Sequence, residues 1–173
     1  MKTILFMPLF STMLYVAGFT DTEHKEIIVH ESFNRICIHG EMKVILVQRD
    51  SDSIVLYRDG KVAVEVNNGE LVLRQKKSLF SNSQLFVIIP VAQLNALKIT
   101  SDATVFTQGI LKTKELNVDH RGNGIVKLSV AADNVYVCSK GKGKIEIEGN
   151  YKQVLARQDE TGCMIIEYRN KEK

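Results

Sequence analysis

Two acidic residues, Glu146 and Glu148, have the residue type and spacing that polysaccharide-cleaving enzymes use. Alternate residues of a strand face the same side, so the two carboxylates would lie together and could bind calcium or act as general acid and base. One repeat earlier, however, the aligned residues are Lys127 and Ser129 rather than further acids. Apolar residues alternate with all four, and this pattern is typical of a strand with one face in water. We therefore favour a solvent-exposed face over a catalytic or calcium site.

His120 is the second candidate for catalysis, because Ser101 and Ser139 lie nineteen residues before and after it and Asp119 adjoins it. A serine nucleophile needs a histidine that is oriented by a buried acid. Asp119 does not fit this role, since neighbouring residues of a strand point to opposite sides. The other histidines lie near the start of the chain at spacings that do not suit a metal. We therefore expect no catalytic residue, no metal site and no cofactor, and a polysaccharide-cleaving enzyme is the weakest alternative.

Aromatic rings and exposed charges are better candidates, because they bind sugars or proteins without catalysis. On geometric grounds the candidate binding residues are Phe80, Tyr136, Tyr151, Arg121 and Lys140. Tyr136 points outward if its strand alternates, and Tyr151 lies near a turn. Phe80 lies in a basic loop, where capping one end of the fold is favoured over contact with a ligand.

Arg121 and Lys140 belong to a polar set at nineteen-residue spacing that also includes Asp102 and Asp159. A ladder of charges on the solvent side adds little stability per pair. We interpret this set mainly as a feature that maintains register and solubility, with ligand binding as the alternative.

The elements that must position these residues repeat every nineteen residues in the second half of the chain. The residues predicted to stack inward are Leu97, Leu116, Val135 and Val154. A second inward set continues through Val126, Ile145 and Met164, and its first member is Thr107 or, as the alternative, Val105. Stacked repeats of about twenty residues are typical of a solenoid, in which each coil buries its apolar side against the next.

Glycines follow the same spacing and are predicted to form the corners of the coils: Gly122, Gly124, Gly141, Gly143 and Gly162. Glycine permits positive φ where a coil bends sharply. A phosphate-binding loop would need a helix after it, and no helical period follows these glycines.

The first half of the chain contains short runs rich in Val, Ile and Leu, separated by turn signals. The strands expected there are 36–38, 44–47, 53–57, 62–66, 71–73 and 85–89, the last ending at Pro90. No window has a helical period. The sequence therefore predicts an all-β fold, namely a single-stranded β-helix-like solenoid with a roughly 19-residue coil period in the C-terminal half.

The N-terminal residues 1–18 have the pattern of a cleaved secretory signal peptide: a lysine, an uncharged apolar stretch and small residues. We expect a flexible leader at 19–31, a folded domain at 32–168 and a charged tail at 169–173. No transmembrane segment is expected once the signal is cleaved, and Phe19 stands where a lipoprotein signal needs cysteine.

Charge and cysteine content narrow the class of protein further. The formal net charge is only +3, and charges of both signs alternate along the chain. Nucleic-acid binding needs a basic stripe, so it is not expected. The cysteines are Cys37, Cys138 and Cys163, and this odd number leaves at least one thiol unpaired.

The segment Ser32–Gly40, followed by Val44–Gln48, resembles the opening of the putative auto-transporter adhesin head GIN domain family. Residues 68–73, 86–90 and 94–99 also resemble it, and the resemblance extends from about Ser32 to Ile166. The corners depart from the Ser-Gly-Ser-Gly pattern of the family. The resemblance implies an exported bacterial protein of the cell envelope with a β-helical core, and it brings no catalytic residues.

These observations predict an exported, non-catalytic protein in the periplasm or on the surface of a Gram-negative-type bacterium. Its expected role is adhesion, by binding a glycan or protein of the envelope or surface. A self-associating scaffold in the periplasm is the alternative, because an unpaired coil end offers free backbone groups to another copy.

Overall fold

The computed structural model describes residues 24–57, 62–75, 85–159 and 162–168, and these residues form strands and turns without a helix. The strands of the first half are β1 (His24–Ile28), β2 (Arg35–His39), β3 (Met42–Gln48), β4 (Ser53–Tyr57), β5 (Val62–Asn67), β6 (Glu70–Gln75) and β7 (Leu85–Val91). Those of the second half are β8 (Ala96–Ile99), β9 (Thr104–Gln108), β10 (Leu111–Lys112), β11 (Glu115–Arg121), β12 (Ile125–Lys140), β13 (Lys144–Gln158) and β14 (Cys163–Tyr168). The all-β class and the six expected strands are confirmed, although β7 continues through Pro90 to Val91.

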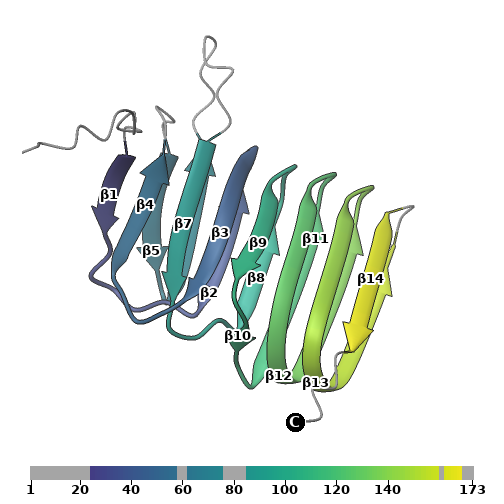
Figure 1. Cartoon of the computed structure of the whole chain (residues 1–173). Helices are drawn as coiled ribbons and strands as arrows, with labels where there is room; N and C mark the ends of the chain where they lie inside the picture. The colour runs from purple at the N-terminus through teal and green to yellow at the C-terminus, as the bar shows by residue number, and fades with distance from the viewer. Residues whose placement is uncertain (1–23, 58–61, 76–84, 160–161, 169–173) are drawn as a thin grey trace, which may run out of the picture.

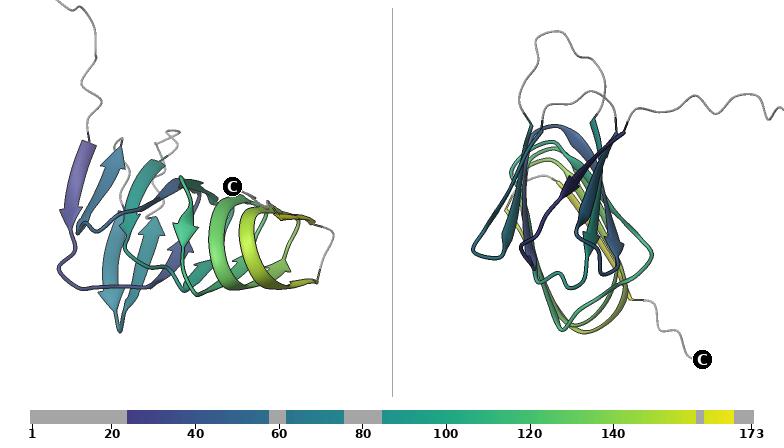
Figure 2. Two further views of the ribbon diagram at one scale, coloured as in Figure 1. Left: turned by 60° about the horizontal axis from the view of Figure 1, so that its bottom comes forward. Right: turned by 90° about the vertical axis from the view of Figure 1, so that its left-hand side faces the viewer.

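All of these strands belong to one mixed sheet that curls into a half-barrel (Figures 1 and 2). The order along the sheet is β1-β4-β7-β3-β9-β12-β11-β8-β2-β6-β5, and β12 also pairs with β10 and with β13, which pairs in turn with β14. The strands of the first half therefore enter the sheet out of chain order.

The predicted single-stranded β-helix is wrong for this chain. In a β-helix successive coils pair in parallel, whereas β1 and β4, β4 and β7, and β5 and β6 pair antiparallel. A tight turn causes the last of these pairings: Asn68 has a φ of 51° and Gly69 a φ of 74°. Two successive residues with positive φ reverse the chain into a hairpin where a coil would have continued.

The second half keeps a nineteen-residue register between parallel neighbours, since Leu116 pairs with Val135 and Val135 with Val154. The preceding step is longer, because Leu97 pairs with Val118, twenty-one residues further on. The prediction that Leu97 stacks on Leu116 is therefore wrong. Two additional residues in the turns of this coil shift the register.

The same shift decides the second inward set. Val105 pairs with Val126, which pairs with Ile145, and all three are fully buried. Val105, the alternative first member, therefore takes the inward place, and Thr107 does not.

The curled sheet has two sides, which we call front and back. The front side contains β1, β4, β7, β3, β9, β14 and the first parts of β12 (125–130) and β13 (144–149). The back side contains β5, β6, β2, β8, β11 and the second parts of β12 (134–140) and β13 (153–158). Inward side chains of both sides form one hydrophobic core between them, so the outward positions are the ones open to a ligand.

The predicted corner glycines lie in the turns between strands, where backbones of neighbouring coils come very close. A Cβ atom at Gly122 would lie 2.2 Å from the Ser101 carbonyl oxygen, and one at Gly124 would lie 2.0 Å from that of Ala103. Among the five predicted glycines only Gly141 has a positive φ, 136°. Close backbone approach, more than positive φ, therefore requires glycine at these corners.

Strand β1 lies within the segment predicted as a flexible leader, and it pairs with β4. The predicted signal peptide at 1–18, Phe80 and the charged tail at 169–173 lie outside the described residues.

Candidate functional site

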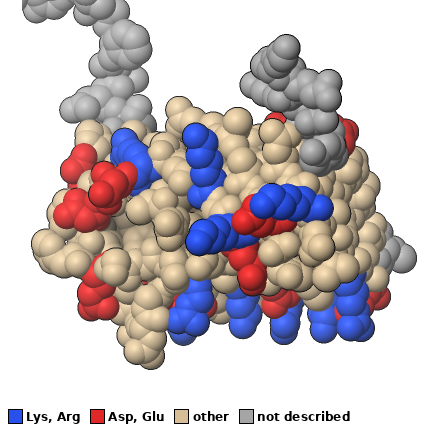
Figure 3. All heavy atoms as spheres, turned by 90° about the horizontal axis from the view of Figure 1, so that it is seen from below, with Lys and Arg blue, Asp and Glu red and all other residues tan. Residues whose placement is uncertain are grey.

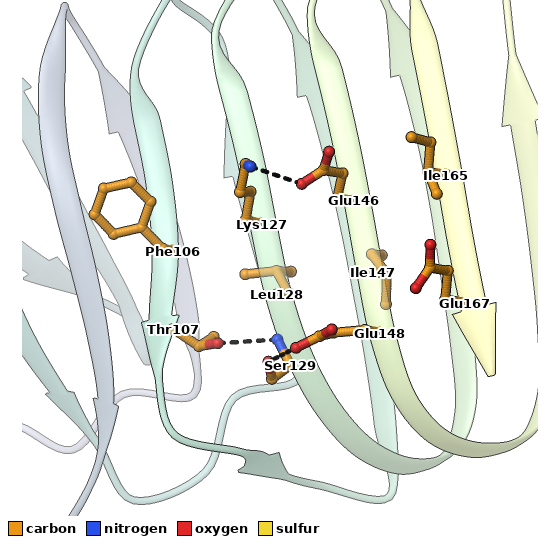
Figure 4. Close-up of a pocket in the computed structure, with 10 residues that line it drawn as sticks. All are labelled: Phe106, Thr107, Lys127, Leu128, Ser129, Glu146, Ile147, Glu148, Ile165 and Glu167. Carbon is orange, nitrogen blue, oxygen red and sulfur yellow. Dashed lines mark hydrogen bonds and ion pairs between the residues drawn. The ribbon is translucent and has the colours of Figure 1, made fainter. Parts of the chain in front are cut away.

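A groove of about 410 Å³ crosses the outer surface of the front side (Figure 4). It lies over β9, β12, β13 and β14 and is lined by Phe106, Thr107, Lys127, Leu128, Ser129, Glu146, Ile147, Glu148, Ile165 and Glu167. Apart from Thr107, which has the same phase on β9 as the inward Val105, the polar members are outward residues of their strands, so strand alternation brings them to this surface.

Hydrogen bonds and an ion pair order the polar side chains of the groove. The Ser129 backbone N–H donates to Thr107 Oγ1 (2.9 Å), and Ser129 Oγ donates to Glu148 Oε1 (2.7 Å). Lys127 Nζ lies 2.9 Å from Glu146 Oε2. These residues lie on three adjacent strands, so a ligand along the groove would meet hydroxyl, carboxylate and ammonium groups in sequence.

Glu146 is held in its ionised form. Hydrogen bonds from Lys144 and then from Lys127 lower the pKa of its carboxyl below the usual value. A general acid in glycoside cleavage needs the opposite shift, a raised pKa. Glu146 is therefore suited to accept hydrogen bonds and not to donate a proton.

An aromatic row adjoins the groove on the front side. The Lys43 ammonium lies 5.3 Å from the centre of the Phe106 ring and 5.9 Å from that of Phe86, within the range of a cation–π contact. Tyr57 packs edge-on against Phe86, with ring centres 5.8 Å apart. Phe106 belongs to both features, because it also lines one end of the groove (Figure 4).

The predicted contacts Tyr136, Arg121 and Lys140 lie on the back side, away from this groove. Arg121 and Lys140 are register partners on β11 and β12, and Tyr136 lies on β12 four residues before Lys140. Arg121 forms an ion pair with Asp119 (2.8 Å), which raises the pKa of its guanidinium. Tyr151, in contrast, is buried, with 9% of its surface exposed, and is unsuited to ligand contact.

The predicted polar set at nineteen-residue spacing, Asp102, Arg121, Lys140 and Asp159, is only partly in contact. Lys140 lies 3.6 Å from Asp159, as neighbouring opposite charges at this spacing should. Asp102 does not join them, because the longer first step turns it toward Asn123, whose backbone N–H donates to Asp102 Oδ1 (2.7 Å).

The suspected Ser–His arrangement is not formed through Ser101. His120 points into the core between its register partners Ile99 and Ser139, and it is fully buried. The Ser101 hydroxyl donates to the Gly40 carbonyl (2.8 Å) instead. Neither ring nitrogen of His120 has a hydrogen-bond partner among the described residues, and burial lowers its pKa.

Reasoning from the sequence missed Phe106, and it interpreted Glu146 and Glu148 as the water-facing residues of an ordinary strand, with catalysis as the weaker alternative. The signal was present in part, because outward positions of a strand follow from its alternation. Which strands lie side by side was not readable, and the groove exists only because β9 pairs with β12.

Charges of both signs are interspersed on the surface. Figure 3, which views the molecule from below, shows lysine and arginine side chains along one edge with acidic side chains among them. Within the described ranges, no three His, Cys, Asp or Glu residues are grouped so as to hold a metal ion. Nor does that part of the chain contain a helix with the length and apolarity needed to span a membrane.

The class of protein follows from a family comparison. The family described as putative auto-transporter adhesin, head GIN domain, matches residues 32–166, and the chain belongs to this family. The resemblance seen in the sequence is thus confirmed. No curated protein matches the chain in sequence.

Solved structures of low sequence identity share the fold. A putative adhesin from Bacteroides fragilis NCTC 9343 superposes with a TM-score of 0.54 at 14% identity, covering 85% of this chain and 93% of that one. A putative lipid binding protein from Parabacteroides distasonis ATCC 8503 has a TM-score of 0.50 at 12% identity, covering 86% and 96%. A putative cell adhesion protein from Clostridium sporogenes ATCC 15579 has a TM-score of 0.50 at 12% identity, covering 85% and 99%.

Proposed function

We propose that this chain is an exported, non-catalytic binding protein of the bacterial cell envelope, and that it binds a glycan in the front-side groove. The observation that carries the proposal is the combination in one groove of an aromatic ring, Phe106, with ordered hydroxyl, carboxylate and ammonium groups. Membership of a family described as putative adhesins supports a binding role.

The groove chemistry suits a sugar better than an apolar ligand. Sugar rings present an apolar face that packs on an aromatic ring and hydroxyls that form hydrogen bonds. Phe106 supplies the first contact, and Ser129, Glu148 and the Lys127–Glu146 pair supply the second. Since the carboxylates outnumber the ammonium group that lines the groove, a neutral or amine-bearing sugar is favoured over an acidic one.

Export is proposed from the signal-peptide pattern of residues 1–18 together with the adhesin description of the family. One relative of the same fold is described as a putative lipid binding protein. A lipid ligand is the competing reading of the aromatic row, and the experiment below distinguishes it from a glycan.

The test is a glycan array probed with the purified protein, followed by calorimetric titration with the best glycan. Phe106→Ala should weaken binding about tenfold, the size expected for loss of one stacked aromatic contact. Tyr136→Ala, an outward aromatic change on the back side, is the matched control and should leave binding unchanged. Binding only to lipid vesicles, or equal loss in both variants, would refute the proposal.

A further inference from the structure

We propose that two copies of this chain stack head to tail, the C-terminal end of one sheet pairing with the N-terminal end of the next. Both ends carry free strand edges among the described strands. At the C-terminal end β14 pairs only with β13, and residues 153–157 of β13 pair only with β12 among the described strands. At the N-terminal end β1 pairs only with β4, and β5 only with β6.

The core is left open at the C-terminal end. In one inward row Val135 is fully buried, whereas its register partner Val154 is 37% exposed. In the next row Val137 is 3% exposed, whereas its partner Ala156 is exposed to solvent. The apolar rows thus end in water, and a further strand placed over them would bury them.

The backbone at this edge is suited to pairing. The Asp159 N–H donates to the Ser139 carbonyl on β12 (2.9 Å). Backbone groups of successive residues in a strand face opposite neighbours, so residues of odd number face β12. The N–H and C=O groups of Val154 and Ala156 therefore face away from β12, toward the free edge.

Strand directions allow a second copy to continue the sheet. On the front side, β1 is antiparallel to β4, and β4 is antiparallel to β7, so β1 and β7 run in the same direction. From β7 the sheet continues through β3, β9, β12 and β13 to β14 by parallel pairings, so β1 is also parallel to β14. On the back side, β5 would meet β13 antiparallel. Both are ordinary sheet pairings.

Extending the rows into a second copy brings apolar residues together on the back side. The inward row that ends at Ala156 begins at Val66, so stacking would set Val66 of the next copy beside Ala156. The front-side row that ends at Met164 begins at Lys25, so there the side chain of Lys25 would meet Met164. The back-side contact buries Val66, which is now partly exposed, and Ala156, which is now exposed.

Charge complementarity favours this partner over others. One outward row runs from Glu65 on β5 to Arg157 on β13, so stacking would bring Glu65 of the next copy beside Arg157. Both side chains are exposed, Arg157 by 79%. Arg157 already pairs with Asp159 (2.8 Å), and Lys152 with Asp133 (2.7 Å). Two C-terminal edges facing each other would therefore bring no further acid to Arg157, whereas the N-terminal edge brings Glu65.

A head-to-tail contact uses two different surfaces, and copies that each continue the sheet along one axis do not return to the first copy, so the contact leads to open filaments. Strand β14 contributes to both features, because Ile165 and Glu167 line the groove and the free edge of the same strand belongs to the interface. The inference does not depend on the ligand proposed for the groove.

The experiment is sedimentation velocity of the purified full chain over a concentration series, with electron microscopy of the most concentrated sample. We expect a mass that grows continuously with concentration, and thin filaments. Ala156→Pro removes one N–H that faces the edge and none that bonds β12, so it should abolish growth while the circular dichroism of the monomer stays unchanged.

A second set of variants, with reversed charges at the proposed contact, tests the proposal even if the proline variant unfolds. Arg157→Glu and Glu65→Arg should each raise the concentration needed for growth roughly tenfold, and the double variant should restore it. Lys98→Glu, in the same row but within the sheet, is the matched control and should have no effect. A monomer at every concentration, a closed dimer that stops growing, or a double variant no better than either single change would overturn the proposal.

Discussion

Replacing His120 by leucine is expected to stabilise the protein. His120 is fully buried, and neither of its ring nitrogens has a hydrogen-bond partner among the described residues. A buried polar group without a partner costs about 1–3 kcal/mol, and an apolar side chain of similar size avoids that cost. His120→Leu should therefore raise the free energy of unfolding by about 1–3 kcal/mol near neutral pH.

The difference in the free energy of unfolding between the leucine variant and the wild-type protein should grow in acid. Burial lowers the pKa of His120 below its usual 6.5, an effect that the charges of Asp102 and Asp119 oppose. Below pH 6.5 the unfolded chain binds a proton at this position more readily than the folded protein does. The free energy of unfolding of the wild-type protein is therefore not reduced by His120 titration above pH 6.5, and it decreases as the pH falls below that value. The leucine variant has no titrating group at this position and lacks this decrease.

The assay is urea unfolding followed by circular dichroism at about pH 7.5 and about pH 5.5, with linear extrapolation to water. His39→Leu is the matched control, because His39 Nδ1 lies 2.6 Å from Thr100 Oγ1 and the change breaks this contact. The control should lose about 1 kcal/mol near neutral pH. If His120→Leu destabilises the fold as much as His39→Leu does, the account of His120 as an unpartnered buried ring is refuted.

Three further predictions concern the packing of the core, the corner glycines and the cysteine thiols. Val135→Ala should cost roughly 2–3 kcal/mol and Val154→Ala roughly 1 kcal/mol in urea unfolding of the monomer, since only the first is fully buried; equal costs would contradict the open C-terminal end. Gly124→Ala should cost at least about 2 kcal/mol, because its Cβ would meet a carbonyl oxygen at 2.0 Å, and an unchanged melting temperature would count against the corner geometry. In the folded protein a thiol reagent should modify exposed Cys163 first, while Cys37, buried and with its thiol pKa raised by that burial, should react only on unfolding; equal rates would show that Cys37 is accessible.

Local features of the fold could be predicted because they depend on neighbouring residues. The alternation in runs such as Val44–Val47 indicates a strand with one buried face, and Val44 and Leu46 are fully buried as that pattern requires. The glycines at Gly122 and Gly124 marked turns for the same local reason.

The candidate site could be predicted only in fragments. Glu146 and Glu148 were identified as outward acids of one strand, and they lie on the groove. Phe106 was not selected, because nothing near it in the chain indicates that β9 lies beside β12. Tyr151 was misjudged, since its position near a bend says nothing about whether the ring turns inward, and it is buried.

The sequence by itself determined the strands, the nineteen-residue spacing of the second half and the class of the family, because alternation and repeats are properties of the chain. The tertiary structure decided which strands are neighbours. Antiparallel pairing of β1, β4 and β5, and the longer step from Leu97 to Val118, turned an expected solenoid into a curled half-barrel. Pairing joins residues far apart in the chain and depends on turn length and on burial of both faces, so the groove on the front side exists only in the folded molecule.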